Sequence, residues 1–160
     1  MLAADLVWFV LRWGLIGGIA VTVYLVGVWQ LGFIPSVRNE SGGSPRAVLV
    51  AAVVTGAGSL LLYTVLLVMA DVRDLLEGGI DLPFARLYAL NFLVYLFWLF
   101  YDTFVIDILL VSVWHPAFLR LPEQQAHGSV AYHLRTIPRG LILGAFVSGV
   151  ATSISWLFFR

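Results

Sequence analysis

The sequence predicts an all-α, polytopic membrane protein, a bundle of four transmembrane helices in a single domain over residues 1–160. Hydrophobic residues make up 61% of the 160 residues and charged residues 11%, whereas soluble domains average about 45–50% and about 25%. Four stretches are also each long and apolar enough to cross a hydrocarbon core of about 30 Å, which takes about 20 residues. The lipid bilayer is therefore the first partner we expect.

The first predicted helix covers residues 6–34 and contains one charge, Arg12, near its start. Trp8 and Trp13 flank that end and Trp29 lies near the other, as aromatic residues do at membrane interfaces. The apolar run is longer than that of a cleaved signal peptide, so we expect the helix to be retained.

The other three helices are predicted at residues 47–70, 87–114 and 140–159. Residues 47–70 contain no charge, and the last segment is bounded by Arg139 and Arg160. We expect connections at residues 35–46, 71–86 and 115–138. The second is acidic, and its apolar residues indicate a short interfacial segment that ends at Pro83. This even number of spans predicts that both termini lie on the same side.

The arginine count gives the expected orientation. Five Arg lie in or beside the first and third connections and four lie on the other side, which favours loops one and three in the cytoplasm. All nine basic residues are Arg, which is typical of GC-rich codon usage. We therefore expect the cell membrane of a bacterium, its inner membrane.

Small residues at four-residue spacing predict close packing between helices, because lipid supplies no hydrophobic drive for association. They are Gly14 and Gly18; Ala51, Thr55 and Ser59; and Gly140, Gly144, Ser148 and Thr152. The pattern does not distinguish packing within one chain from packing in a homo-oligomer.

Several function classes are excluded or disfavoured. The net charge is zero without a basic run, so we expect no nucleic-acid partner. The chain has no cysteine, and the spacing of its three His does not fit a zinc site, so we expect no metal and no cofactor. The GxSxG, P-loop and HExxH patterns are missing, which leaves enzymatic activity undecided.

Asp102 and Asp107 in the third helix carry the strongest functional signal. A charged Asp at a helix centre costs about 2.5–3.5 kcal/mol on insertion, so each needs a partner or a proton. At 100° per residue, Asn91, Tyr95, Trp98 and Asp102 share one face. Asp107 lies about 140° from Asp102 on a straight helix, so we expect the two carboxylates to point to different faces unless the helix kinks.

Basic residues near the third connection supply candidate partners for Asp107. We expect Asp107 to contact Arg139 or a histidine, because His115, His133 and Arg135 lie on the same side. Asp102 has no basic residue at its depth. We expect it to be protonated, or to accept hydrogen bonds from hydroxyls such as those of Tyr63, Ser148 or Thr152.

Residues 97–144 contain three motifs: two Asp five residues apart, the turn Pro-Ala-Phe-Leu-Arg-Leu-Pro at 116–122, and His133-Leu-Arg135 before Gly140. This stretch resembles an uncharacterised family of small bacterial four-helix integral membrane proteins. The resemblance implies a four-helix architecture and groups Asp102 and Asp107 with His133 and Arg135. It implies no activity.

Two hypotheses about function follow from these residues. The first is a buried polar site centred on Asp102 and Asp107 that binds a cation, a proton or a lipophilic small molecule. The second is an accessory or structural subunit of a larger membrane complex, without an activity of its own.

Overall fold

The computed structural model describes residues 3–30, 45–114 and 130–159. Four long helices, α1 (Ala3–Gln30), α2 (Pro45–Ala70), α3 (Phe84–Tyr101) and α5 (Val130–Phe158), account for most of them. Two π-helical segments, η3 (Asp71–Leu76) and η4 (Asp102–Trp114), extend α2 and α3. Four helical stretches are long and apolar enough to span a membrane. The chain is thus an all-α four-helix bundle and a multi-pass membrane protein.

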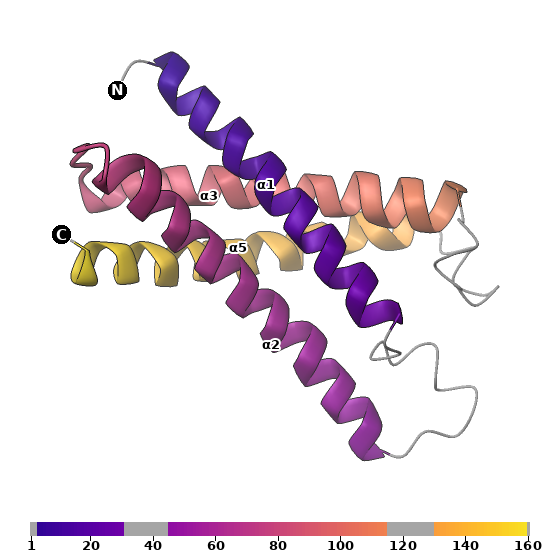
Figure 1. Cartoon of the computed structure of the whole chain (residues 1–160). Helices are drawn as coiled ribbons and strands as arrows, with labels where there is room; N and C mark the ends of the chain where they lie inside the picture. Colours follow the sequence, from indigo (N-terminus) through magenta and orange to yellow (C-terminus); the bar gives the residue numbers. More distant parts are fainter. Residues whose placement is uncertain (1–2, 31–44, 115–129, 160) are drawn as a thin grey trace.

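The helices form two crossing layers (Figure 1). In that view α1 and α2 run diagonally across α3 and α5. Between the layers, α1 packs mainly on α3 and α2 mainly on α5, with a smaller contact between α2 and α3. The core lies between all four long helices. The side chains of Leu67, Val94 and Ala151 are fully buried there, and α1 contributes Phe9 and Trp13. The rings of Phe84 and Trp156 are in contact, which puts the start of α3 beside the end of α5.

Glycine residues allow α1 and α5 to approach α3 closely. A Cβ on Gly14 of α1 would lie 2.7 Å from the Phe97 ring, and a Cβ on Gly144 of α5 would overlap the Tyr95 ring. The predicted glycine faces therefore pack within one chain against side chains of α3, which are aromatic at Gly14 and Gly144 and Leu99 at Gly140.

α2 continues as a helix beyond the predicted end at residue 70. Val72, Leu75 and Leu76 keep the apolar spacing of the helix, and Leu75 is 1% exposed. Gly79 then ends the helix with a φ of 69°, a conformation that glycine adopts without strain. Residues 71–76 thus belong to the bundle and not to an extramembrane loop.

α5 begins at Val130, ten residues before the predicted start at residue 140, and it contains Pro138. Proline removes one backbone hydrogen bond, which normally disfavours a helix interior. In membrane helices side-chain hydroxyls can bond the backbone near a proline, and Thr136 donates a hydrogen bond to the carbonyl of His133 at 2.7 Å.

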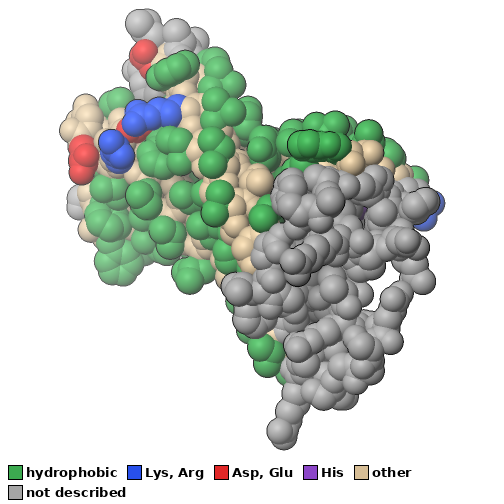
Figure 2. All heavy atoms as spheres, turned by 45° about the vertical axis from the view of Figure 1, so that its right-hand side comes forward, with side chains coloured by type: hydrophobic (Ala, Val, Ile, Leu, Met, Phe, Trp, Pro, Cys, Tyr) green, Lys and Arg blue, Asp and Glu red, His purple; other side chains and the backbone are tan. Residues whose placement is uncertain are grey.

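The surface agrees with a membrane location. Among the residues that are coloured in Figure 2, hydrophobic side chains prevail, and the visible charged side chains lie toward the ends of the molecule. Large apolar side chains such as Val23, Leu61 and Ile142 are more than half exposed. Such a band suits contact with lipid chains rather than water.

Candidate functional site

A cavity of about 320 Å³ lies between α2, the junction of α3 and η4, and α5. Its lining combines two carboxylates, one guanidinium, two phenol rings, three hydroxyl side chains and five apolar residues. They are Gly56, Ser59, Leu60, Tyr63, Tyr95, Leu99, Asp102, Thr103, Asp107, Thr136, Arg139, Gly140 and Leu143. The cavity thus brings together polar groups from three separate membrane-spanning stretches.

Asp102 and Asp107 both line this cavity, so the prediction that they point to different faces is wrong. That prediction assumed 100° per residue, the geometry of an α-helix. Residues 102–114 are π-helical, and π-helical hydrogen bonds join residues five apart, which brings such residues nearly above one another. The Ser112 hydroxyl follows the same spacing and donates to the carbonyl of Asp107 at 2.9 Å.

Asp107 has a histidine partner, one of the two kinds of contact expected from the sequence. Nδ1 of His133 lies 3.2 Å from Oδ2 of Asp107. The contact exists because α5 starts early enough to include His133 in its first turn. Arg139, the other expected partner, lines the same cavity about 1.7 turns further along α5.

Asp102 lacks the hydroxyl partners that we expected. Its Oδ1 atom is buried and has no hydrogen-bond partner among the described residues. Thr152 instead accepts a hydrogen bond from Asn91, and Tyr63 lines the cavity. Asp102 is therefore a carboxylate at the wall of a cavity with one oxygen unsatisfied by the described protein.

Three aromatic rings form one packed group next to Asp102. The Tyr63 ring stacks on Trp98 with centroids 5.6 Å apart and meets Tyr95 edge-on at 5.4 Å. Trp98 is 2% exposed, and its Nε1–H donates to the carbonyl of Trp13 at 3.0 Å. The two tyrosines reach the cavity, whereas Trp98 stands behind them and fixes their position.

Asn91 does not belong to this cavity, although its spacing placed it on the same face as Asp102. Its Nδ2 donates to Oδ2 of Asp71 at 2.9 Å and to the hydroxyl of Thr152 at 3.0 Å. Asn91 therefore belongs to a second polar cluster nearer the other end of α3. Asp71 was not among the predicted site residues, because its acidic neighbours Asp74, Glu77 and Asp81 are typical of a connection between helices.

The remaining predicted residues are placed differently. Arg135 is exposed and is not part of the cavity lining. His115 lies outside the described residues. The structure thus brings together Asp102, Asp107 and Tyr95 of the predicted site, with His133 and Arg139 beside them.

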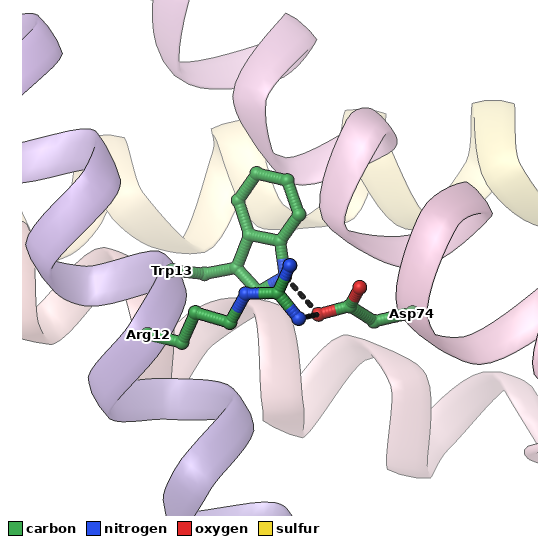
Figure 3. Close-up of polar contacts among 3 residues, drawn as sticks. All are labelled: Arg12, Trp13 and Asp74. Carbon is green, nitrogen blue, oxygen red and sulfur yellow. Dashed lines mark hydrogen bonds and ion pairs between the residues drawn. The ribbon is translucent and has the colours of Figure 1, made fainter.

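A further polar contact fixes α1 to η3 (Figure 3). Oδ2 of Asp74 accepts hydrogen bonds from Nη1 of Arg12 at 2.9 Å and from Nε1 of Trp13 at 2.7 Å. A lone arginine in an apolar helix needs a counter-charge. The presence of Arg12 in such a helix is therefore the feature of the sequence that indicates an acidic partner. The contact lies toward the end of the bundle opposite the cavity, and it is structural.

The described residues contain no group of three or more His, Cys, Asp or Glu side chains that could hold a metal ion. The cavity instead offers separate carboxylates, hydroxyls and rings, which suit a ligand larger than a single ion. No protein-family model, curated protein or solved structure matches the chain.

Proposed function

We propose that this membrane protein binds a small organic cation in the cavity beside Asp102. The observation that carries the proposal is the buried Oδ1 of Asp102, which has no hydrogen-bond partner among the described residues and lies at the wall of a 320 Å³ cavity. An ionisable residue inside a membrane segment is costly unless function or a partner compensates. A cationic ligand supplies that partner.

The charges of the lining favour a cation over an anion. The lining carries two carboxylates against one guanidinium, that of Arg139. Asp107 has His133 as its basic neighbour, whereas Asp102 has no ion-pair partner in the described part of the chain. The Tyr63 and Tyr95 rings beside the carboxylate add favourable electrostatic contact, since aromatic faces attract cations by about 0.5–2 kcal/mol.

The size of the cavity favours an organic molecule over a bare ion. Ligand pockets for small molecules start at about 300 Å³, and this cavity holds about 320 Å³. Leu60, Leu99 and Leu143 provide apolar wall next to the polar groups. A compact amine or quaternary ammonium with one apolar substituent matches this combination of an apolar wall and a carboxylate.

Binding of benzyltrimethylammonium tests the proposal. The ligand carries a permanent charge and one ring, and neopentylbenzene has the same shape without the charge. We expect the purified protein to bind the cation and not the neutral molecule, and Asp102→Asn to lose most of the affinity. Asp81→Asn, which removes a charge outside the cavity, serves as the matched control and keeps the affinity.

Two results would count against a cation site. Equal binding of the charged and neutral molecules would show that shape alone is recognised. No binding of either molecule to the folded protein favours the accessory-subunit hypothesis, in which Asp102 has no ligand. Co-purification with larger membrane partners then becomes the informative measurement.

For the location of the protein we propose the inner membrane of a bacterium, with the first and third connections facing the cytoplasm. The support is the bias of five Arg against four described above. Reporter fusions after Ser41 and after Ala126 are expected to report the same, cytoplasmic compartment. Opposite compartments at the two sites contradict the four-span topology.

A further inference from the structure

A second buried polar cluster lies between η3, α3 and α5, away from the cavity. Asp71, Asn91, Thr152 and Ser155 form it, and all four residues are 0% exposed. The Asn91 amide joins Asp71 to Thr152 through hydrogen bonds of 2.9 and 3.0 Å. Ser155 lies beside the Asp71 carboxyl. Three membrane-spanning stretches thus each contribute at least one oxygen atom to one buried place.

This cluster has more acceptor oxygens than the described protein satisfies. Oδ1 of Asp71 and Oδ1 of Asn91 are both buried without a hydrogen-bond partner among the described residues, and the Ser155 hydroxyl lies against the Asp71 carboxyl. Buried polar groups that lack partners cost about 1–3 kcal/mol each. Two such oxygens within one buried cluster point to a bound species that supplies their missing partner.

The charge at this place is also unbalanced. Two arginines lie at this end of the bundle. Arg12 is already paired with Asp74, and the side chain of Arg73 is exposed. Asp71 itself has no ion-pair partner in the described part of the chain. A buried carboxylate without a counter-charge is strongly unfavourable, so the species that fills the cluster has to supply positive charge.

We infer that Asp71, Asn91, Thr152 and Ser155 form a site for one sodium ion. Carboxylate, amide and hydroxyl oxygens are the ligands of hard cations. A single carboxylate balances a single positive charge, whereas a divalent ion would leave the buried site with net charge. The fully packed surroundings, with Leu75 and Ala151 at 1% or less exposure, suit the smaller alkali ion.

The sodium site is independent of the proposed ligand cavity. Asn91 and Asp102 are eleven residues apart, about 16 Å along a helix. The Tyr95 and Trp98 rings occupy the space between the two levels, and both are buried. A variant at either site can therefore be examined without changing the other.

The experiment measures thermal unfolding of the purified protein in choline chloride, with sodium chloride replacing choline at constant ionic strength. We expect a saturable rise in Tm, about 3–6 °C at a sodium concentration ten times the Kd. Potassium at the same concentrations is expected to give a smaller rise. Equal rises with sodium, potassium and choline would overturn the inference, because they would reflect ionic strength alone.

Variants assign the effect to the cluster. Asp71→Asn is expected to abolish the sodium dependence of Tm, and Ser155→Ala to raise the half-saturating sodium concentration about tenfold or more. Ser148→Ala is the matched control, since Ser148 is equally buried and lies two turns away on the same helix. If Asp71→Asn does not fold, the comparison of Ser155→Ala with Ser148→Ala still decides.

The Asp102→Asn variant separates this inference from the proposed function. The sodium-dependent rise in Tm is expected to persist in that variant. If the rise is lost in Asp102→Asn and kept in Asp71→Asn, sodium binds in the cavity and the second site does not exist. The absence of any sodium effect on the wild type would mean that water or a proton fills the cluster, and the inference fails.

Discussion

Replacing Gly17 by alanine should destabilise the bundle strongly, because α1 crosses α3 at this residue. A Cβ on Gly17 would overlap the indole of Trp98. That indole has little freedom to move, since it is 2% exposed, donates a hydrogen bond to the carbonyl of Trp13, and stacks on Tyr63. The added methyl group must therefore push the helices apart or break these contacts.

The contacts at Gly17 set the size of the effect. Overpacking of a filled core costs about 1–3 kcal/mol, and losing the Trp98 hydrogen bond costs about 0.5–1.5 kcal/mol. Alanine returns up to about 1 kcal/mol through its better helix propensity. We therefore expect Gly17→Ala to lower the free energy of unfolding by about 1–4 kcal/mol.

Gly27 offers a matched control in the same helix, since a Cβ there meets nothing within 4 Å. The same substitution at Gly27 should stabilise the protein by about 0.4–1 kcal/mol, because alanine restricts the unfolded chain. Unfolding in detergent, followed by circular dichroism, measures both variants. Equal stability changes for Gly17→Ala and Gly27→Ala would refute the close approach of α1 and α3.

Three further substitutions test other contacts. Gly144→Leu should lower the free energy of unfolding by about 1–3 kcal/mol or more, because an aromatic ring fills the space beside Gly144. Leu143→Ala should lower it less, because Leu143 is 38% exposed. Equal losses in melting temperature would contradict this packing. Asp107→Asn should lower stability by about 1 kcal/mol rather than the 3–5 of a fully buried pair, because the carboxylate is 32% exposed; an unchanged melting curve would remove the role of its histidine contact. Asp74→Ala should lower the free energy of unfolding by about 1–3 kcal/mol, because it leaves the buried indole N–H of Trp13 without an acceptor. Asp74→Asn should lower it less, because the asparagine side chain keeps an acceptor oxygen. The reverse order would show that the ion pair dominates.

The four helices followed directly from the sequence, because apolar length reports burial in lipid whatever the packing. The glycine faces also pack as expected, since Gly14 and Gly144 carry a steric signal that can be read without coordinates. The small-residue pattern did not predict which side chains pack against these glycines. Both faces meet aromatic rings of α3, and aromatic side chains occur on every predicted helix.

The helix ends were harder to predict, and they decided the polar contacts. Asp71 and Asp74 resembled loop residues because acids are rare inside membrane segments, yet each has a partner on another helix. Pro138 resembled a helix boundary, but α5 continues through it and carries His133 to Asp107. Propensity is a local signal, and tertiary hydrogen bonds overrode it at these residues.

The geometry of the carboxylate pair could not be predicted from spacing. Asp102 and Asp107 differ by about 140° on an α-helix, and only the change to π-helical geometry at Asp102 brings both to one cavity. Such changes leave no clear pattern in an apolar segment. The sequence therefore indicated which two carboxylates belong to the site, but not that both face the same cavity.

The most direct test of the cation site is a crystal structure of the protein with 4-bromobenzyltrimethylammonium, in which the anomalous signal of bromine locates the ligand. The proposed function predicts one bromine peak inside the cavity between α2, η4 and α5, with the ammonium group beside Asp102 and the ring against Tyr63 and Tyr95. Soaking Asp102→Asn crystals under the same conditions should give no peak there. An empty cavity in the wild type, or bromine only at lipid-facing surfaces, would contradict the proposal.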